Sequence, residues 1–153
     1  MNDNPQFTEY VTFTTGGQLF GLPIGRVQEV FRPGRITRVP LAGAQIAGVL
    51  NLRGRIVTAI DMRCRLSLEA SDGGQPGMAI GIESRGESFG LLVDSLGEVL
   101  KLADGEREAN PVNLDRKLAR VAAGVYRLEG QLMVVLDVER VLDFAADQIG
   151  IAA

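Results

Sequence analysis

The amino-acid sequence contains an internal duplication, and this feature limits the fold more than any other. A shift of 69 residues places identical residues on Gly17, Phe20, Gly21, Leu22, Glu29 and Val30. A shift of 76 aligns residues 47–66 with residues 123–142, and seven of the twenty pairs are identical. Because the two matches follow the same order in both halves, the chain holds two copies of one unit of roughly five short strands.

Short stretches of alternating or β-branched residues predict an all-β fold, mainly strands with a few short helices. They cover residues 9–14, 19–22, 48–52, 56–60, 78–84, 88–93, 122–128 and 132–136. Four turn signals separate neighbouring stretches and predict four hairpins, at residues 16–17, 53–54, 85–87 and 129–130. Each unit is small enough to close as a barrel but too small to bury much surface alone, so we expect the two to share an apolar seam.

Helical turns are expected where a capping residue precedes a short apolar segment. Asp61 begins one such segment and its repeat partner Asp137 begins the other, so that each carboxylate caps free backbone N–H groups over residues 61–66 and 137–144. A further helical turn is expected over residues 25–30. Residues 68–77 and 103–120 are interpreted as loops because they are polar and rich in Gly or contain Pro.

The residue inventory argues against an enzyme, a metal site and a cofactor. The chain has no histidine and one cysteine, Cys64, which excludes an internal disulfide and most acid-base, nucleophilic and zinc-binding arrangements. Asp61, Asp94 and Asp137 follow apolar strands, where catalytic acids often lie, but structural roles are the favoured interpretation. No apolar run is long enough to cross a bilayer and no secretion signal precedes the first strand, so a cytoplasmic protein is expected.

Charge is distributed unevenly along the chain. Residues 25–65 contain eight arginines against Glu29 and Asp61, which gives +6; since the whole chain carries −3, the remainder carries −9. A basic small barrel leaves open an alternative function, the binding of single-stranded nucleic acid. That function also needs exposed aromatic platforms, and the chain has no tryptophan and only two tyrosines, Tyr10 and Tyr126.

One motif resembles the signature of the CheW family of chemotaxis coupling proteins. Residues 48–57 read GVLNLRGRIV and lead into Ile60-Asp61-Met62-Arg63, with Thr58 where the family has proline and Met62 where it has leucine. Further matching segments follow in family order at residues 20–30, 90–100 and 132–139. The resemblance covers about residues 7–144, nearly the whole chain.

The resemblance implies a fold of two five-stranded SH3-like barrels packed as one CheW-like domain over residues 7–144. The first barrel is expected over roughly 10–68 and the second over roughly 78–137, with crossing elements allowed. Residues 1–6 are expected to form a disordered tail and residues 145–153 a frayed one. The implied function is that of a non-enzymatic adaptor at membrane-associated receptor arrays. It would couple the cytoplasmic tips of chemoreceptors to the CheW-like regulatory domain of the histidine kinase CheA, and other CheW-like domains in rings are further expected partners.

The resemblance also assigns two sets of binding residues. Those implied for the receptor are Val27, Glu29, Arg53 and Ile56, and those implied for the kinase are Leu96, Glu98 and Val99. For Val27, Ile56 and Val99, the alternative interpretation is that their side chains are buried in the hydrophobic core and contact no partner. Arg53 is the most informative position because its repeat partner is Glu129, so equivalent turns of the two halves carry opposite charges.

Overall fold

The computed structural model describes residues 5–66, 68 and 77–143. The predicted tail 145–153, and all but the last two residues of the predicted tail 1–6, lie outside the described residues. The strands of the first half are β1 (Phe7–Thr15), β2 (Gln18–Pro23), β3 (Val27–Phe31), β4 (Ile46–Leu52) and β5 (Arg55–Asp61). Those of the second half are β6 (Met78–Ser84), β7 (Glu87–Val93), β8 (Ser95–Ala103), β9 (Ala122–Leu128) and β10 (Gln131–Leu136).

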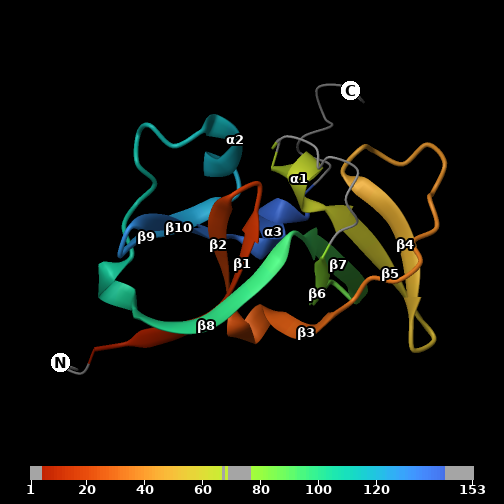
Figure 1. Cartoon of the computed structure of the whole chain (residues 1–153), viewed down its shortest axis with the longest axis horizontal. Helices are drawn as coiled ribbons and strands as arrows, with labels where there is room; N and C mark the ends of the chain where they lie inside the picture. Colours follow the sequence, from red (N-terminus) through yellow and green to blue (C-terminus); the bar gives the residue numbers. More distant parts are fainter. Residues whose placement is uncertain (1–4, 67, 69–76, 144–153) are drawn as a thin grey trace.

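The strands form two five-stranded sheets that lie side by side (Figure 1). Sheet A has the order β8-β1-β2-β10-β9, and sheet B has the order β3-β6-β7-β5-β4. Each strand of sheet A has a repeat partner whose number differs by five, such as β1 and β6. When every strand of sheet A is replaced by its repeat partner, the order of sheet B results. The structure therefore confirms the duplication, because both sheets are built by the same rule.

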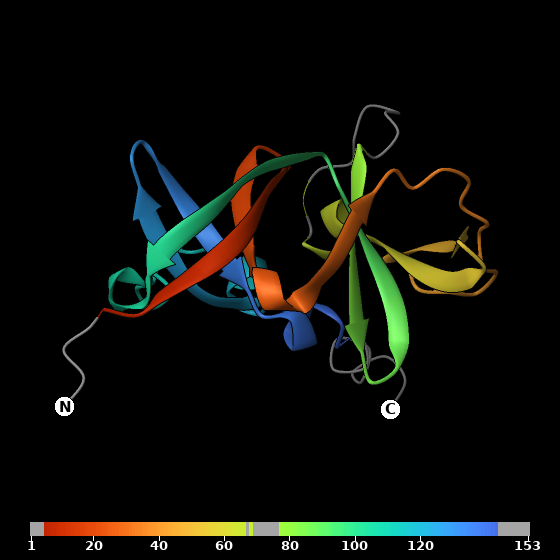
Figure 2. The same cartoon turned by 90° about the horizontal axis from the view of Figure 1, so that it is seen from below.

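Each sheet takes strands from both halves of the chain. In Figure 2, red β1 shares a sheet with β8 and blue β10, and orange β3 shares the other sheet with green β6 and β7. The contacts between halves include two parallel pairings, β2 with β10 and β5 with β7. All other pairings are antiparallel, and they include the four predicted hairpins. Sheet B takes its strands from residues 27–93 and sheet A from residues 7–23 and 95–136, so neither sheet coincides with an expected unit of 10–68 or 78–137.

The two units are SH3-like sheets rather than closed barrels, because their outer strands are not paired with each other within the described ranges. Instead, Thr37, in the segment between β3 and β4, links the two ends of sheet B. It exchanges two hydrogen bonds of 2.8 Å with Val49 of β4. Glu108 makes the equivalent bridge to Val125 of β9 in sheet A. Because β3 ends at Phe31, two residues before Pro33, it does not itself reach β4.

The main core lies between the sheets and draws side chains from both. Phe13 and Phe20 of sheet A stack with ring centroids 5.4 Å apart and belong to one buried cluster with Ile80 and Leu91 of sheet B. All four side chains are completely buried. The expected apolar seam is confirmed, and it makes the two sheets one cooperative body.

Three short α-helices and two 3-10 turns join the strands. The helices are α1 (Met62–Arg65), α2 (Arg116–Ala119) and α3 (Val138–Val141), and the 3-10 turns are η1 (Ile24–Arg26) and η2 (Asp104–Glu106). The predicted caps are confirmed: Asp61 accepts a hydrogen bond of 3.2 Å from the N–H of Cys64, and Asp137 accepts one of 3.2 Å from that of Arg140.

Burial, and then the charge of Asp61, raise the pKa of the Cys64 thiol, which therefore stays protonated at neutral pH.

Three parts of the sequence-based prediction are wrong, and one of them is the loop expected over residues 103–120, which contains η2 and α2. The helical turn expected over residues 25–30 ends at Arg26, because Val27 begins β3 and pairs with β6, where Val30 lies opposite Ile80. The third miss is β8, which was not predicted and whose last residue, Ala103, was placed in a loop. Most of β8 is exposed and its inward side chains are only half-buried, so it lacks the continuous apolar signal of a central strand.

We expect Gly48→Ala to destabilise the fold, because a Cβ at this position would collide with the carbonyl group of Thr37 in the closing bridge. The expected loss is roughly 1–3 kcal/mol of unfolding free energy, measured by urea unfolding. Gly105→Ala is the matched control, since its Cβ would meet nothing within 4 Å. Equal unfolding of both variants would show that the bridge yields without cost.

Candidate protein-binding surfaces

A cluster of charges lies at the outer end of sheet B, around Glu29 of β3. One oxygen of Glu29, Oε1, accepts a hydrogen bond of 2.5 Å from Nη2 of Arg53, and the other, Oε2, lies 3.6 Å from Nη2 of Arg55. The Glu29 side chain is 22% exposed, whereas those of Arg53 and Arg55 are 73% and 51% exposed. One half-buried carboxylate is thus shared by two exposed cations, and the cluster keeps a net positive charge.

The backbone of the β4–β5 hairpin holds Arg53 in place. Arg53 and Gly54 have φ angles of 53° and 85°, and two consecutive positive φ values are typical of a type I′ turn. The side chain of Asn51 accepts a hydrogen bond of 2.8 Å from the N–H of Gly54, which stabilises this turn. The β6–β7 hairpin has the same geometry at Arg85 and Gly86, with φ angles of 52° and 80°.

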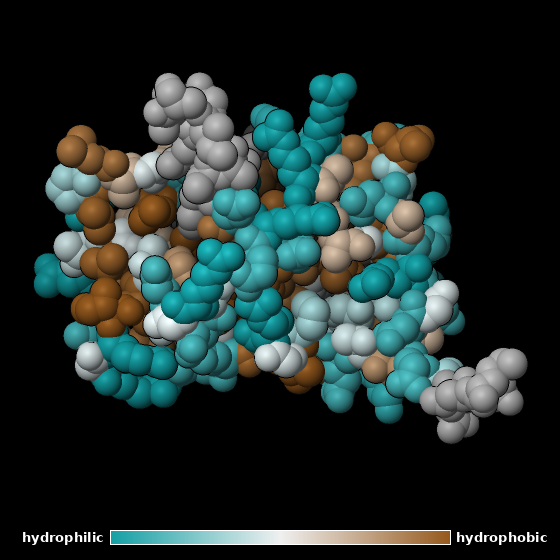
Figure 3. All heavy atoms as spheres, turned by 180° about the vertical axis from the view of Figure 1, so that it is seen from behind, coloured by the Kyte–Doolittle hydropathy of each residue, from teal (hydrophilic) through white to brown (hydrophobic). Residues whose placement is uncertain are grey.

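Apolar surface lies beside this cluster. Ile56 of β5 is 64% exposed and borders a hollow of about 390 Å³. The hollow is lined by residues 31–35, Thr37, residues 49–52 and Ile56. Hydrophobic and hydrophilic residues lie side by side along this end of the molecule in Figure 3.

Three of the four residues assigned to the receptor therefore lie at one end of the molecule, and the fourth packs against the main core. Glu29 and Arg53 form an ion pair, and Ile56 is exposed beside Arg55. Val27 instead packs, half-buried, against the main core. Sequence reasoning missed Arg55 as the second partner of Glu29, although its place in the Arg53-Gly54-Arg55 turn was a usable signal.

The residues assigned to the kinase lie on β8 in sheet A, at positions equivalent to those on β3. Leu96 packs half-buried against the main core, whereas Glu98 and Val99 are exposed, Val99 by 51%. Glu98 is the repeat partner of Glu29, but the partner of Arg53 is Glu129. Within the described ranges neither Glu98 nor Glu129 has an ion pair. The outer end of sheet A is therefore acidic where that of sheet B is basic.

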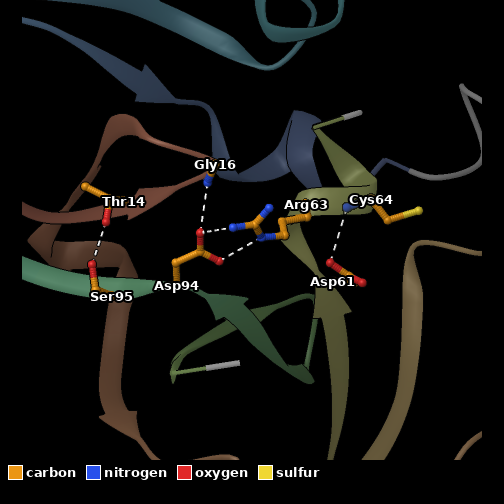
Figure 4. A network of polar contacts seen from close by, with 7 residues as sticks. All are labelled: Thr14, Gly16, Asp61, Arg63, Cys64, Asp94 and Ser95. Carbon is orange, nitrogen blue, oxygen red and sulfur yellow. Dashed lines mark hydrogen bonds and ion pairs between the residues drawn. The ribbon is translucent and has the colours of Figure 1, made fainter. Parts of the chain in front are cut away.

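An ion pair fixes the place where the chain crosses from β7 to β8 (Figure 4). Nη2 of Arg63 in α1 lies 2.5 Å from Oδ2 of Asp94, and Nε of Arg63 donates to Oδ1 at 3.0 Å. The same carboxylate accepts a hydrogen bond of 2.9 Å from the N–H of Gly16 in the β1–β2 turn. The hydrogen bond from Arg63 is the main cause that lowers the pKa of Asp94. Asp94 thus ties sheet A to sheet B.

A second ion pair holds the place where the chain crosses from β2 to β3. The sign of the charge on the crossing segment is the opposite of that at the first crossing. Here the cation, Arg26, lies on the crossing segment and the carboxylate, Glu139, lies on α3, at an N–O distance of 2.6 Å. Glu139 also accepts a hydrogen bond of 2.8 Å from Ser84, the last residue of β6. Glu139 is the repeat partner of Arg63. It also lines a groove of about 660 Å³ between α3 and sheet B, which contains both acidic and basic side chains.

The three carboxylates considered for catalysis all have structural partners. Asp61 and Asp137 cap helices, and Asp94 pairs with Arg63. Within the described part of the chain, no cluster of three or more acidic, cysteine or histidine side chains could hold a metal ion. The described ranges also contain no helix long and apolar enough to cross a membrane.

The alternative of nucleic-acid binding has no support, because the two tyrosines are not surface platforms. Tyr10 and Tyr126 are 2% and 1% exposed, pack edge to face, and bring their hydroxyl oxygens within 3.3 Å of each other. Burial, and then the hydrogen bond with Tyr10, raise the pKa of Tyr126. Base stacking requires exposed rings, which these tyrosines do not offer.

Comparisons with known proteins agree with this architecture. The family model described as the CheW-like domain matches residues 9–146. The chemotaxis protein CheW of Rhizobium meliloti is 29% identical over 87% of this chain and 86% of its own length, and that of Bacillus subtilis is 27% identical over 90% and 88%. The solved structure of the scaffolding protein TtCheW from Thermoanaerobacter tengcongensis superposes with a TM-score of 0.78 and 26% identity, covering 90% of this chain and 89% of that one.

We expect Asp94→Asn to destabilise the protein at pH 7 by roughly 1–2 kcal/mol, because the amide cannot replace a carboxylate that accepts from Arg63. The pKa of Asp94 is lower in the folded than in the unfolded chain. The stabilisation is therefore complete above the unfolded value of about 4 and is lost as the pH falls through the folded value.

Urea unfolding of both proteins from pH 7 down to pH 3 measures this difference, with Glu87→Gln as the control for losing one exposed carboxylate. A gap between Asp94→Asn and the unaltered chain that stays constant across this range would contradict the assignment.

Proposed function

This chain belongs to the family of CheW-like domains, and on that premise we propose that it is a non-enzymatic adaptor coupling chemoreceptors to the histidine kinase CheA in chemotaxis signalling. An adaptor must hold two partners at once, so it needs two surfaces that do not compete. The fold supplies them as the outer ends of sheets A and B, which lie far apart on one rigid body. We further propose that it works in the cytoplasm, at membrane-associated receptor arrays.

One observation carries this proposal: equivalent positions of the duplicated unit carry opposite charges at the two ends. Glu29 is paired with Arg53 and Arg55 in sheet B, whereas the corresponding place in sheet A holds Glu98 and Glu129. The backbone of the two units follows one rule, so this divergence does not serve the fold. Opposite charge at two ends selects different partners, because like charges brought together at an interface are repelled.

We assign the Glu29 cluster of the basic end to the receptor and β8 at the acidic end to the kinase. The arginines that follow β3 (Arg32, Arg35 and Arg38) are assigned to the contact with the kinase's own CheW-like domain. The receptor surface comprises Glu29, Arg53 and the exposed Ile56, with Val27 supporting β3 from the core side. The kinase surface comprises the exposed residues of β8, Glu98 and Val99, with Leu96 anchoring that strand. Each surface combines apolar area with a charge that orients the partner, as protein-binding surfaces generally do.

Contacts between CheW-like domains follow from the same charge pattern. A basic end of one domain and an acidic end of another are unlike surfaces, so their contact is heterologous and can close into a ring. The kinase's own CheW-like domain is the proposed partner in such contacts.

We expect Arg53→Glu to weaken binding of the receptor tip at least several-fold while changing unfolding free energy by about 1 kcal/mol or less, because exposed ion pairs add little stability. The variant places a second carboxylate beside Glu29 and reverses the charge of the turn. Binding is measured with a purified receptor cytoplasmic fragment, and folding by thermal melting.

Arg85→Glu is the matched control, since Arg85 occupies the same turn position in the β6–β7 hairpin and has a φ of 52°. Unchanged binding by Arg53→Glu, or equal loss in both variants, would remove the charge at Arg53 from the receptor site.

We expect the association rate with the kinase to fall as salt rises, and the dissociation rate to change less, because exposed charges are screened beyond about 8 Å at physiological ionic strength. Replacing Arg32, Arg35 and Arg38 together by glutamine should slow association several-fold. Stopped-flow or biosensor kinetics measure both rates.

A control variant with glutamine at Arg85, Arg116 and Arg120 removes the same charge from other exposed positions. Association that is indifferent to salt and to the first set of substitutions would leave apolar contacts as the only cause of binding.

A further inference from the structure

The strand that carries the proposed receptor residues begins with an irregular pairing. Val27 of β3 lies opposite Ile82 of β6. Glu29, two residues later, lies opposite Gly81, which is only one residue away from Ile82. Gln28 is therefore the extra residue of a β-bulge. A bulge bends its strand and turns the side chains beyond it, so the pairing with β6 does not alone fix the direction of Glu29.

Side chains hold the segment that leads into this bulge. Arg26, the last residue of η1, places its Nη2 2.6 Å from Oε2 of Glu139 in α3. The same Nη2 donates a hydrogen bond of 3.4 Å to the carbonyl oxygen of Glu83 in β6. Beyond it, Nε2 of Gln28 donates one of 3.0 Å to Oε2 of Glu83. The direction of β3 at its start therefore depends on polar side chains as well as on backbone pairing.

Glu139 is the residue that joins these contacts to another element. Its second oxygen, Oε1, accepts a hydrogen bond of 2.8 Å from Ser84, so the carboxylate connects η1 with the end of β6. The Arg26 guanidinium, and then the Ser84 hydroxyl, hold the pKa of Glu139 below its ordinary value, and the group is ionised at neutral pH. The side chains of Arg26 and Glu139 are 37% and 50% exposed, so their ion pair adds little to stability.

The other crossing strand, β8, repeats both features. Leu96 lies opposite Phe13 and Val99 opposite Val11, so β8 also has one extra residue at the equivalent place. An ion pair to a helix again precedes the bulge, here between Asp94 and Arg63 (Figure 4). Both crossing strands thus combine a bulge with an ion pair just before it. Because the combination occurs in both halves while its charges are reversed, it belongs to the duplicated unit.

We propose that Arg26 and Glu139 are positioning residues of the receptor surface, whose ion pair aims β3 so that Glu29 meets Arg53. This inference rests on the proposed function and deepens it by naming two residues that act without touching the receptor. Arg26 lies three residues before Glu29, on the other side of the bulge. The hydrogen bond between Glu29 and Arg53 is short, so a small change in the direction of β3 is enough to break it.

The test reverses the two charges singly and together in the full chain. Arg26→Glu and Glu139→Arg each place like charges opposite one another, and we expect each to lower the affinity for a purified receptor cytoplasmic fragment roughly fivefold. The double variant restores the ion pair with its sign reversed, and the Ser84 hydroxyl can accept from an arginine as well as donate to a carboxylate. Its affinity should return to within about twofold of the unaltered chain, as measured by calorimetry.

Arg127→Glu is the matched control, because it breaks another exposed ion pair, with Glu108 in sheet A. This variant should bind the receptor fragment as the unaltered chain does. The melting midpoint of every variant should fall by about 4 °C or less, since exposed ion pairs add little stability. Loss of binding without loss of folding is what separates a positioning role from general destabilisation.

The outcomes also separate this inference from the proposed function. Loss in both single variants with recovery in the double variant would support the positioning role. Loss in Arg26→Glu that the double variant does not recover would show that Arg26 contacts the receptor directly, which contradicts the role. Full affinity in both single variants, or an equal loss in Arg127→Glu, would overturn it as well. Failure of the unaltered chain to bind the fragment would overturn the proposed receptor contact itself.

Discussion

The parallel pairing of strands from opposite halves is the constraint on which the rest of the structure depends. Within each half, hairpins supply only local antiparallel pairs, whereas β2–β10 and β5–β7 join segments that are far apart in the chain. Together with the antiparallel pairs β1–β8 and β3–β6, these two pairings place strands of both halves in each sheet and their side chains in the common core. The distance between the two outer ends is therefore set by buried packing, which is what an adaptor needs in order to hold partners in a fixed relation.

Local features of the fold could be predicted from the sequence because their causes are local. Turn residues such as Arg53-Gly54 indicate hairpins, and Asp61 and Asp137 cap the helices that their positions suggest. Which strands of the two halves pair with each other could not be predicted from the sequence. The two units are similar, so no local sequence signal identifies the partner of each strand. Strand β8 was missed because its residues are mostly exposed.

The candidate sites show the same division between local and tertiary causes. The segments that match the family identify Glu29 and Arg53 as binding residues, but their ion pair forms only when the fold brings β3 beside the β4–β5 hairpin. The carboxylates divide in a similar way: those of Asp94 and Glu139 hold the two crossings, while those of Glu98 and Glu129 have no ion pair in the described ranges.

The exchange of strands between halves has a consequence for any shorter ancestor of this chain. A single unit of five strands could complete a sheet of this order only by giving strands to a second copy and receiving the same strands in return. That arrangement is a domain-swapped homodimer, with a twofold axis where this molecule has its internal repeat. Gene fusion of such a dimer would free its two halves to diverge. One end could then carry arginine where the equivalent position of the other carries glutamate, which a dimer of identical chains cannot do.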